Sequence, residues 1–162
     1  MLDDLTNLQS LLKDPTLVAT KGYLAGEWCE GDNAQTFPVY NPARGDSIAG
    51  VSDISRAQTA EAISIAEKAQ HIGANRPAKE RSNIMRIWYN LMMENQDDLA
   101  TILTAEQGKP LEEAKGEIGY GASFIEFFAE EAKRIYGETI PGHQADKRIT
   151  VLKQPIGVAA SI

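Results

Sequence analysis

The chain has 162 residues, of which 43% are hydrophobic and 24% charged, as in an ordinary soluble globular protein. Its 23 acidic residues outnumber its 16 basic ones, and the net charge of −7 argues against a nucleic-acid surface and against attraction to anionic membranes. No apolar run approaches the roughly 20 residues of a membrane helix, and the acidic N-terminus predicts no signal peptide. The lone Cys29 cannot form an internal disulfide, so we expect a cytoplasmic location.

The first third of the chain predicts a short helix followed by small strands. Leucines at helical spacing over residues 5–12 precede Pro15, which ends the helix. Short apolar runs between Gly22 and Val51 alternate with turn clusters at residues 30–33 and 41–46. This alternation indicates antiparallel strands joined by tight turns.

Two helices are predicted next. Ser55 and Gln58 have the spacing of a capping box, which starts a helix that ends near Asn75. Pro77 suits the first turn of the following helix. The buried face predicted for that second helix consists of its large apolar side chains, Ile84, Ile87, Trp88, Leu91 and Met92.

Two further helices complete the helical part. Residues 95–108 predict a short helix with Gly108 as its C-cap. The longest helix opens at Pro110 and keeps one apolar face from Leu111 to Ile135, about seven turns at 3.6 residues per turn. Phe128 belongs to that face, and Gly137 ends the helix.

The closing stretch holds two strand-like runs. Residues Arg148 to Lys153 alternate between the two faces of a strand. Residues Ile156 to Ile162 are apolar nearly throughout, as in a strand buried on both faces of a parallel sheet. Such a strand needs a crossover and a neighbour. We therefore expect the flank of an α/β domain whose central sheet is only begun, with part of the function in sequence beyond Ile162.

Few side chains are candidates for chemistry. Cys29 lies between Glu27 and Glu30, whose charges disfavour a reactive thiolate, so a structural role is expected. His71 and His143 have no cysteine nearby, so no metal site is predicted.

The long helix carries carboxylates and glycines in suggestive positions. Glu113 and Glu117 are one turn apart, as are Glu126 and Glu130, but a solvated helix face is commoner than a catalytic pair. The glycine-rich run 116–121 lies inside a helix and follows no strand, so close backbone packing is preferred to phosphate binding. Glycines cost about 1 kcal/mol each in a helix interior, so a compensating contact is expected there.

An aromatic series lies on the same helix. Tyr120, Phe124 and Phe127 follow one another at i, i+4 and i+7. Core packing is the default interpretation of such a series. The wall of a pocket is the alternative.

Together, segments along almost the whole chain resemble the N-terminal part of the aldehyde dehydrogenase superfamily, most closely the succinate-semialdehyde dehydrogenases. The segments that carry the resemblance are Gly26-Glu-Trp28, Asn41-Pro-Ala-Arg-Gly45, Glu80-Arg81 with Ile84 and Arg86, 90–94, 96–100, Glu106-Gln-Gly-Lys-Pro110, 113–118, 122–126, Arg134-Ile-Tyr-Gly137, 140–148 and Lys153-Gln-Pro-Ile-Gly-Val158. Each is weak alone, but the order and spacing are specific. Residues 136–158 favour the succinate-semialdehyde group.

The resemblance implies an organisation into four parts. Residues 1–20 are a helical extension outside the resemblance, and 21–136 form the N-terminal flank of the NAD(P)-binding domain. Residues 137–155 hold an oligomerisation strand, and 156–162 begin the core sheet of the NAD(P)-binding domain, cut short. The implied fold class is α/β, with small hairpins, four to five helices, an oligomerisation strand and the first strand of a Rossmann-like domain.

The resemblance also implies an activity and site residues. The complete protein would oxidise succinate semialdehyde, or a related semialdehyde, through thiolate attack, hydride transfer to NAD or NADP, and thioester hydrolysis. Ile162 matches a position whose backbone lies near the cofactor, and Tyr120 and Phe124 match positions beside the substrate tunnel. The family's catalytic residues lie further on, so this chain supplies none and is expected to be inactive alone. A homo-oligomer, dimer or tetramer, is expected at full length.

Two alternatives stay open. One is a non-catalytic, truncated paralogue that joins a full-length subunit through the edge of residues 148–153. The other is a dehydrogenase of a different aldehyde. Because unpaired strands leave apolar surface open, the isolated chain is expected to be poorly soluble or molten.

Overall fold

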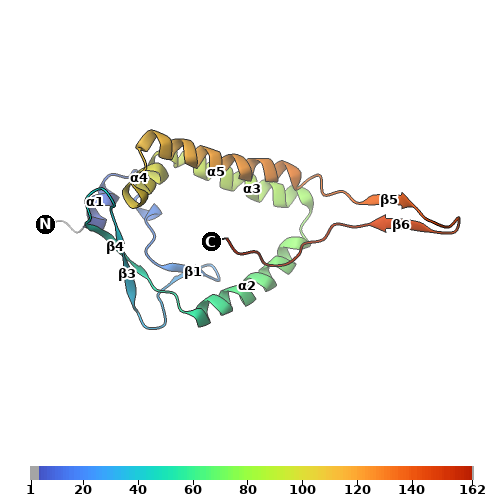
Figure 1. The fold of residues 1–162 in the computed structure, drawn as a ribbon, viewed down its shortest axis with the longest axis horizontal. Helices are drawn as coiled ribbons and strands as arrows, with labels where there is room; N and C mark the ends of the chain where they lie inside the picture. Colours follow the sequence, from blue (N-terminus) through green and yellow to red (C-terminus); the bar gives the residue numbers. More distant parts are fainter. Residues whose placement is uncertain (1–3, 162) are drawn as a thin grey trace.

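The computed structural model describes residues 4–161. In chain order the elements are α1 (Asp4–Ser10), a 3-10 helix (Pro15–Leu17), β1 (Gly22–Leu24), β2 (Glu27–Cys29), β3 (Thr36–Tyr40), β4 (Ser47–Ser52), α2 (Arg56–Ala74), α3 (Ala78–Glu94), α4 (Gln96–Gln107), α5 (Leu111–Glu131), β5 (Glu138–Pro141) and β6 (Arg148–Val151). They are arranged around an open ring, from which the β5–β6 hairpin projects (Figure 1). The mixed α/β content confirms the predicted fold class.

The predicted antiparallel strands are present, and they form two separate hairpins. In β1–β2, Gly22 lies opposite Cys29, and the turn between the strands places Ala25 and Gly26 at φ values of 55° and 91°. Two successive residues with positive φ are what a two-residue hairpin turn requires. The β3–β4 hairpin contains a register shift next to Tyr40, and α1 packs on β4.

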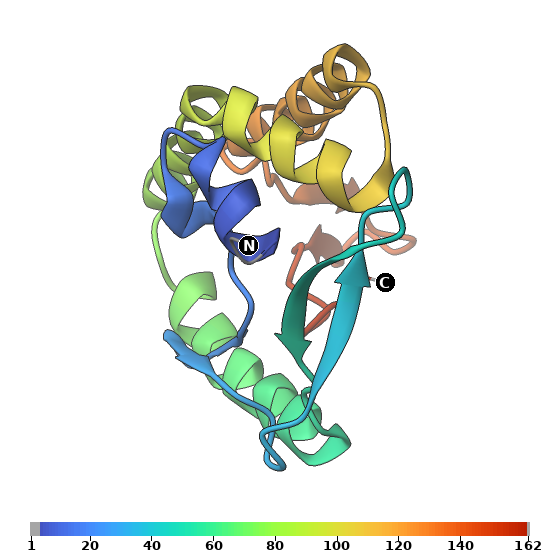
Figure 2. The ribbon, with the colours of Figure 1, turned by 90° about the vertical axis from the view of Figure 1, so that its left-hand side faces the viewer.

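The predicted capping box starts α2. The Ser55 hydroxyl accepts a hydrogen bond from the Gln58 backbone N–H at 3.2 Å, and the Ser55 N–H donates to the Gln58 side-chain oxygen at 3.0 Å. Gln58 also donates to the Glu30 carbonyl at 2.9 Å and accepts from the Asp32 N–H at 3.1 Å. The cap therefore fixes α2 to the β2–β3 turn. Figure 2 shows α2 on the opposite side of the ring from α3, α4 and α5.

The other long helices form one layer, in which α3 and α4 both pack against α5. The buried positions of α5 are Ala114, Ala122 and Ala129, all completely inaccessible to solvent. Their spacing of eight and seven residues keeps them on one face of the helix. Because alanine has a minimal side chain, the neighbouring helices approach this face closely.

The buried face predicted for α3 is wrong among the described residues. Ile84, Ile87, Trp88 and Leu91 are 52–59% exposed, and Met92 is half-buried. The buried residue of α3 is Ser82, and Arg86 on the same side reaches α5. Hydrophobic periodicity correctly finds an apolar face, but it does not say which part of a protein covers that face.

The predicted length of α5 is also wrong, because the helix ends at Glu131 and leaves Ile135 outside. The backbone N–H of Lys133 bonds to Glu130 and that of Arg134 to Glu131, both three residues back, so the last turn tightens instead of continuing. Ile135 and Phe128 are more than half exposed, so neither is buried as predicted.

The C-terminal stretch differs most from expectation. The predicted strand at residues 148–153 is present as β6, shorter by two residues, and it pairs with β5, which was not predicted. Residues 152–161 form no helix or strand, and Ile156 is 99% exposed, so the predicted strand from Ile156 is wrong here. A strand exists only beside a hydrogen-bonded neighbour, and the described residues place none next to this run.

Candidate functional site

The aromatic series of α5 forms an exposed face. The rings of Tyr120 and Phe124 make an edge-to-face contact with their centroids 4.9 Å apart and their planes at 78°. Tyr120 is 66% exposed and Phe124 47%. Phe127 is also about half exposed and contacts Phe128 at 5.2 Å. Core packing, the default interpretation, is therefore wrong within residues 4–161, and we call Tyr120, Phe124 and Phe127 the aromatic face.

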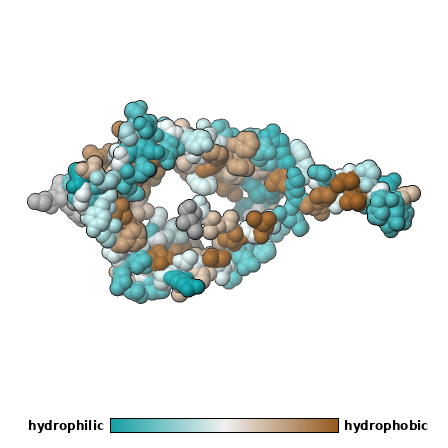
Figure 3. Space-filling model, in the orientation of Figure 1, coloured by the Kyte–Doolittle hydropathy of each residue, from teal (hydrophilic) through white to brown (hydrophobic). Residues whose placement is uncertain are grey.

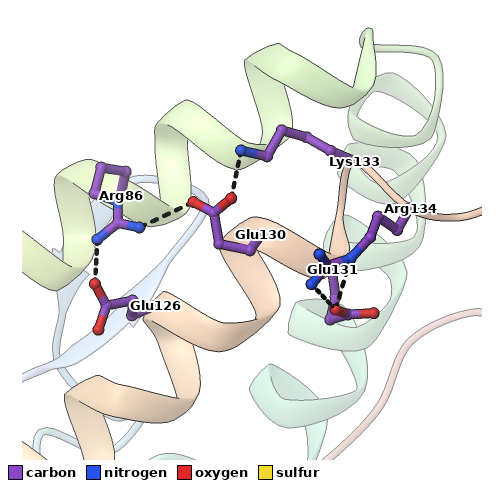
Figure 4. A network of polar contacts seen from close by, with 6 residues as sticks. All are labelled: Arg86, Glu126, Glu130, Glu131, Lys133 and Arg134. Atoms are coloured by element: carbon purple, nitrogen blue, oxygen red, sulfur yellow. Dashed lines mark hydrogen bonds and ion pairs between the residues drawn. The ribbon is translucent and has the colours of Figure 1, made fainter.

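An ion-pair network joins α3 to α5 and to the residues just after α5 (Figure 4). The Arg86 guanidinium donates one hydrogen bond to Glu126 at 2.6 Å and another to Glu130 at 3.0 Å. Glu130 also pairs with Lys133 at 2.6 Å. Glu126 and Glu130 therefore share a cation, which supports the structural interpretation of this carboxylate pair over acid–base catalysis. We call these four residues the Arg86 network.

The Arg86 network adds polar contacts to the packing of α3 on α5. Glu126 lies between Phe124 and Phe127 in sequence, and its carboxylate is tied to α3. One guanidinium on α3 thus binds two carboxylates a turn apart on α5. The network therefore lies on the same stretch of α5 as the aromatic face. Figure 4 also shows Arg134 folded onto Glu131, one turn back on the chain.

The same contacts shift the pKa values of the partners. The hydrogen bond from Lys133, followed by that from Arg86, holds the pKa of Glu130 below its ordinary value. The hydrogen bonds to Glu126 and Glu130 raise the pKa of Arg86. Both shifts favour the charged forms that make the network.

The lowered pKa of Glu130 predicts a loss of stability in acid. The pKa of Glu130 in the folded chain lies below its value in the unfolded chain. The contribution of Glu130 to folding stability is therefore complete above about pH 5 and disappears as the pH falls through the folded-state pKa. Glu130→Gln should lower the unfolding temperature at neutral pH and leave it less sensitive to acid than that of the unchanged chain. Thermal unfolding followed by circular dichroism over this pH range measures both effects. Equal acid sensitivity of the two proteins would contradict the prediction.

The other predicted positions on α5 have structural surroundings. Glu117 pairs with Lys109, and no partner of Glu113 is found in the described part of the chain. A Cβ at Gly119 would lie 3.4 Å from the Gln96 side-chain nitrogen, whereas one at Gly116 or Gly121 would meet nothing within 4 Å. Close packing of another backbone, the preferred interpretation of the glycine run, is thus wrong within the described residues, where the near neighbour of Gly119 is a side chain. The run lies inside α5 and not in a loop after a strand.

The remaining candidates lie apart from one another. Cys29 is half-buried at the end of β2, and His71 lies in the last turn of α2, where its carbonyl accepts a hydrogen bond from Asn75. Residues 4–161 contain no group of three metal-ligating side chains placed to hold an ion. None of their helices is both long and apolar enough to cross a bilayer. Ile162, the predicted cofactor-binding position, lies outside the described residues.

Sequence reasoning missed an apolar hollow inside the ring. One part, about 660 Å³, lies between α2, α3 and residues 153–157, and a neighbouring part of about 570 Å³ lies between α2 and residues 154–158. Figure 3 shows apolar residues along the inner side of the ring. We call this surface the concave face, and its lining includes Ile63, Ala74, Ile84, Met85, Pro155 and Ile156. The apolar runs of α3 and 156–162 carry the signal, but an apolar run alone does not distinguish a buried core from a concave surface.

Comparison with known proteins relates this arrangement to one family. The model described as the aldehyde dehydrogenase family matches residues 28–162. The glutarate-semialdehyde dehydrogenase of Pseudomonas putida is 59% identical over 93% of this chain and 32% of its own length. The succinate-semialdehyde dehydrogenase [NADP(+)] GabD of Escherichia coli is 55% identical over 93% of this chain and 31% of its own.

Solved structures agree. A crystal structure described as an E. coli NADP-dependent enzyme shares 54% identity and superposes with a TM-score of 0.88 over 90% of this chain and 30% of that one. Betaine aldehyde dehydrogenase from Staphylococcus aureus, in complex with NAD+, is 27% identical with a TM-score of 0.78, over 90% of this chain and 29% of that one. The chain spans about a third of the length of the curated relatives that it matches. It belongs to the aldehyde dehydrogenase family and holds the N-terminal part of that fold.

Proposed function

We propose that this chain is the N-terminal part of an NAD(P)-dependent dehydrogenase that oxidises succinate semialdehyde, or a related semialdehyde, to the carboxylic acid. The observation that carries the proposal is the 59% and 55% identity, over 93% of the chain, to relatives named for glutarate and succinate semialdehydes. A relative named 3-sulfolactaldehyde dehydrogenase is 50% identical. These substrates share a short aldehyde with an acidic group at its far end, which is the substrate class we propose.

The complete protein would use NAD or NADP as hydride acceptor, in keeping with the NADP(+) and NAD+ in the names of its relatives. The reaction would pass through a cysteine thioester, with the nucleophile outside this chain, so residues 1–162 alone are proposed to be inactive. The proposed contribution of this part to the cofactor site is the backbone at Ile162. A cytoplasmic homo-oligomer, assembled through the β5–β6 hairpin, completes the proposal.

Tyr120 and Phe124 are the proposed substrate-facing residues. Both are exposed and lie one turn apart on a single helix, and they hold each other in an edge-to-face contact. Such a pair offers rigid apolar area at a small cost in side-chain entropy. The aliphatic part of a semialdehyde is apolar, so this surface suits one wall of its tunnel, whereas the acidic end requires cationic groups elsewhere.

The test uses the complete polypeptide that contains this segment. We expect NAD(P)H formation with succinate or glutarate semialdehyde and much slower turnover of butanal, which lacks the acidic group. Phe124→Ala and Tyr120→Ala should raise KM for the semialdehyde by about tenfold with a smaller change in kcat, because ground-state contact is lost. The matched control is Tyr23→Ala, an equally exposed tyrosine in β1, which should leave KM unchanged. An unchanged KM in both α5 variants would exclude them from the substrate site.

One observation favours a second candidate function. The β5–β6 hairpin projects from the ring as a two-stranded sheet (Figure 1). Its apolar residues Ile140, Ile149 and Val151 are partly exposed. A non-catalytic interaction module would use such an edge to join a full-length subunit. Absence of turnover with every aldehyde tested on the complete polypeptide would favour this candidate over the enzyme.

A further inference from the structure

The contact between α3 and α5 combines small buried residues with one large cation. In the described chain the buried residues of α5 are three alanines, and that of α3 is Ser82. Small side chains let two helices approach closely, but they interlock little across the contact. Among residues 4–161, the side-chain hydrogen bonds that join the two helices are those of Arg86 with Glu126 and Glu130. Arg86 is thus the specific polar contact in an otherwise featureless packing surface.

The Arg86 guanidinium is itself held from several sides. It lies 2.6 Å from Glu126 and 3.0 Å from Glu130 on α5, and its central carbon lies 5.3 Å from the centre of the Tyr89 ring on its own helix. A planar guanidinium can bond two carboxylates and stack on a ring at the same time, whereas the ammonium of lysine is a compact point charge. The arrangement therefore depends on the shape of arginine as well as on its charge.

The partners of the guanidinium lie beside the aromatic face without covering it. Glu126 stands between Phe124 and Phe127 in the sequence. At 3.6 residues per turn, Glu126 and Glu130 lie about 100° around α5 from the centre of the aromatic face. The helix α3 thus holds α5 from one side (Figure 4), while the rings of the aromatic face stay exposed. A change in this contact would act on the backbone that carries the rings and not on the rings themselves.

We propose that Arg86 is a positioning residue for the substrate-facing pair Tyr120 and Phe124. By holding Glu126 and Glu130, it sets the angle at which α5 presents the two rings to the substrate. Arg86 does not touch the substrate in this role and acts only through α5. The role rests on the proposed function, because the two rings must face the substrate for their angle to matter. A displaced binding wall changes substrate affinity more than it changes the chemical step.

The test is a double-mutant cycle in the complete polypeptide, with KM for the semialdehyde as its readout. Arg86→Met should raise KM by about three- to fivefold with a smaller change in kcat, less than the rise of about tenfold expected when a ring is removed. In the background of Tyr120→Ala and Phe124→Ala together, Arg86→Met should change KM by less than about twofold, because no ring remains to be positioned. An equal rise of KM in both backgrounds, or no rise in either, would overturn the proposal.

Two further variants complete the cycle. Arg134→Met is the matched control, because Arg134 also pairs with a glutamate of α5, Glu131, but joins no second helix, so KM should stay unchanged. Equal rises of KM in Arg134→Met and Arg86→Met would overturn the specific role of Arg86. Arg86→Lys keeps the charge and loses the planar fork, so its KM should lie between those of Arg86→Met and the unchanged enzyme. If the methionine variant does not fold, Arg86→Lys takes its place in the cycle.

The outcomes separate the positioning role from the proposed function. A raised KM in Phe124→Ala, with no effect of Arg86→Met or Arg86→Lys, would refute the positioning role and leave the substrate site standing. An unchanged KM in both Tyr120→Ala and Phe124→Ala would refute the substrate site, and the positioning role with it.

Discussion

Asp98→Ala is expected to lower the free energy of unfolding by about 3 kcal/mol, the loss of two hydrogen bonds to a charged group. Asp98 lies in the first turn of α4, and the residue is only 4% exposed. One oxygen accepts the backbone N–H of Lys13 at 3.1 Å, and the other accepts that of Asp14 at 2.8 Å. Alanine would leave both donors without a partner near the helix, and the segment between α1 and β1 would detach from α4.

The neighbouring Asp97 provides the control. Its side chain is exposed and pairs with Lys13 and Lys115 on the surface, both at 3.1 Å. Surface ion pairs of this kind contribute little because water and salt screen them. Urea denaturation of the two variants should therefore give a large shift of the midpoint for Asp98→Ala and a small one for Asp97→Ala. Midpoint shifts of equal size would mean that burial of a carboxylate does not decide how much it contributes to the stability of the folded chain.

Gly31→Ala is expected to destabilise the chain by about 2–3 kcal/mol through overpacking. A Cβ at this position would lie 2.0 Å from the Asp53 carbonyl oxygen and 2.9 Å from its carbon. These are backbone atoms, so the turn after β2 would have to move away from the segment after β4. That movement would also disturb the Asp32 contacts at the start of α2.

The comparison variant is Gly121→Ala, in the interior of α5. A Cβ there would meet nothing within 4 Å, and alanine is favoured over glycine in a helix by roughly 0.5–1 kcal/mol. The same substitution should thus lower the unfolding temperature at Gly31 and raise it at Gly121. Parallel thermal unfolding of both variants measures the difference, and destabilisation at Gly121 would reveal a packing constraint that the structure does not show.

Local signals in the sequence were sufficient to place the ends of most helices. The capping box at Ser55 and the prolines before α3 and α5 act through contacts within a few residues, so they need no knowledge of the fold. Gly108 also follows this rule, since its φ of 81° is the left-handed conformation that a C-cap requires. Helical spacing likewise predicts that Tyr120 and Phe124 lie side by side on α5, and their rings are in contact.

Contacts between distant segments could not be predicted in this way. The Arg86 network joins residues 40 and 44 positions apart, and either of its glutamates alone looks like an ordinary surface charge. The side of α3 that faces α5 is lined by Ser82 and Arg86, so periodicity pointed to the opposite side. The strand predicted from Ile156 has the right composition, but a strand also depends on a neighbour that the described residues do not supply.

The order of contacts along the chain has a consequence for synthesis. The packing of α3 and α4 on α5 joins consecutive segments, and such low contact order favours rapid folding. In the longer relatives this layer would form as soon as it leaves the ribosome, with about two thirds of the polypeptide still to be made. At about 5–20 residues per second, the concave face would stay uncovered on the order of tens of seconds. A molecular chaperone that binds apolar surface would have that interval in which to protect the nascent enzyme from aggregation.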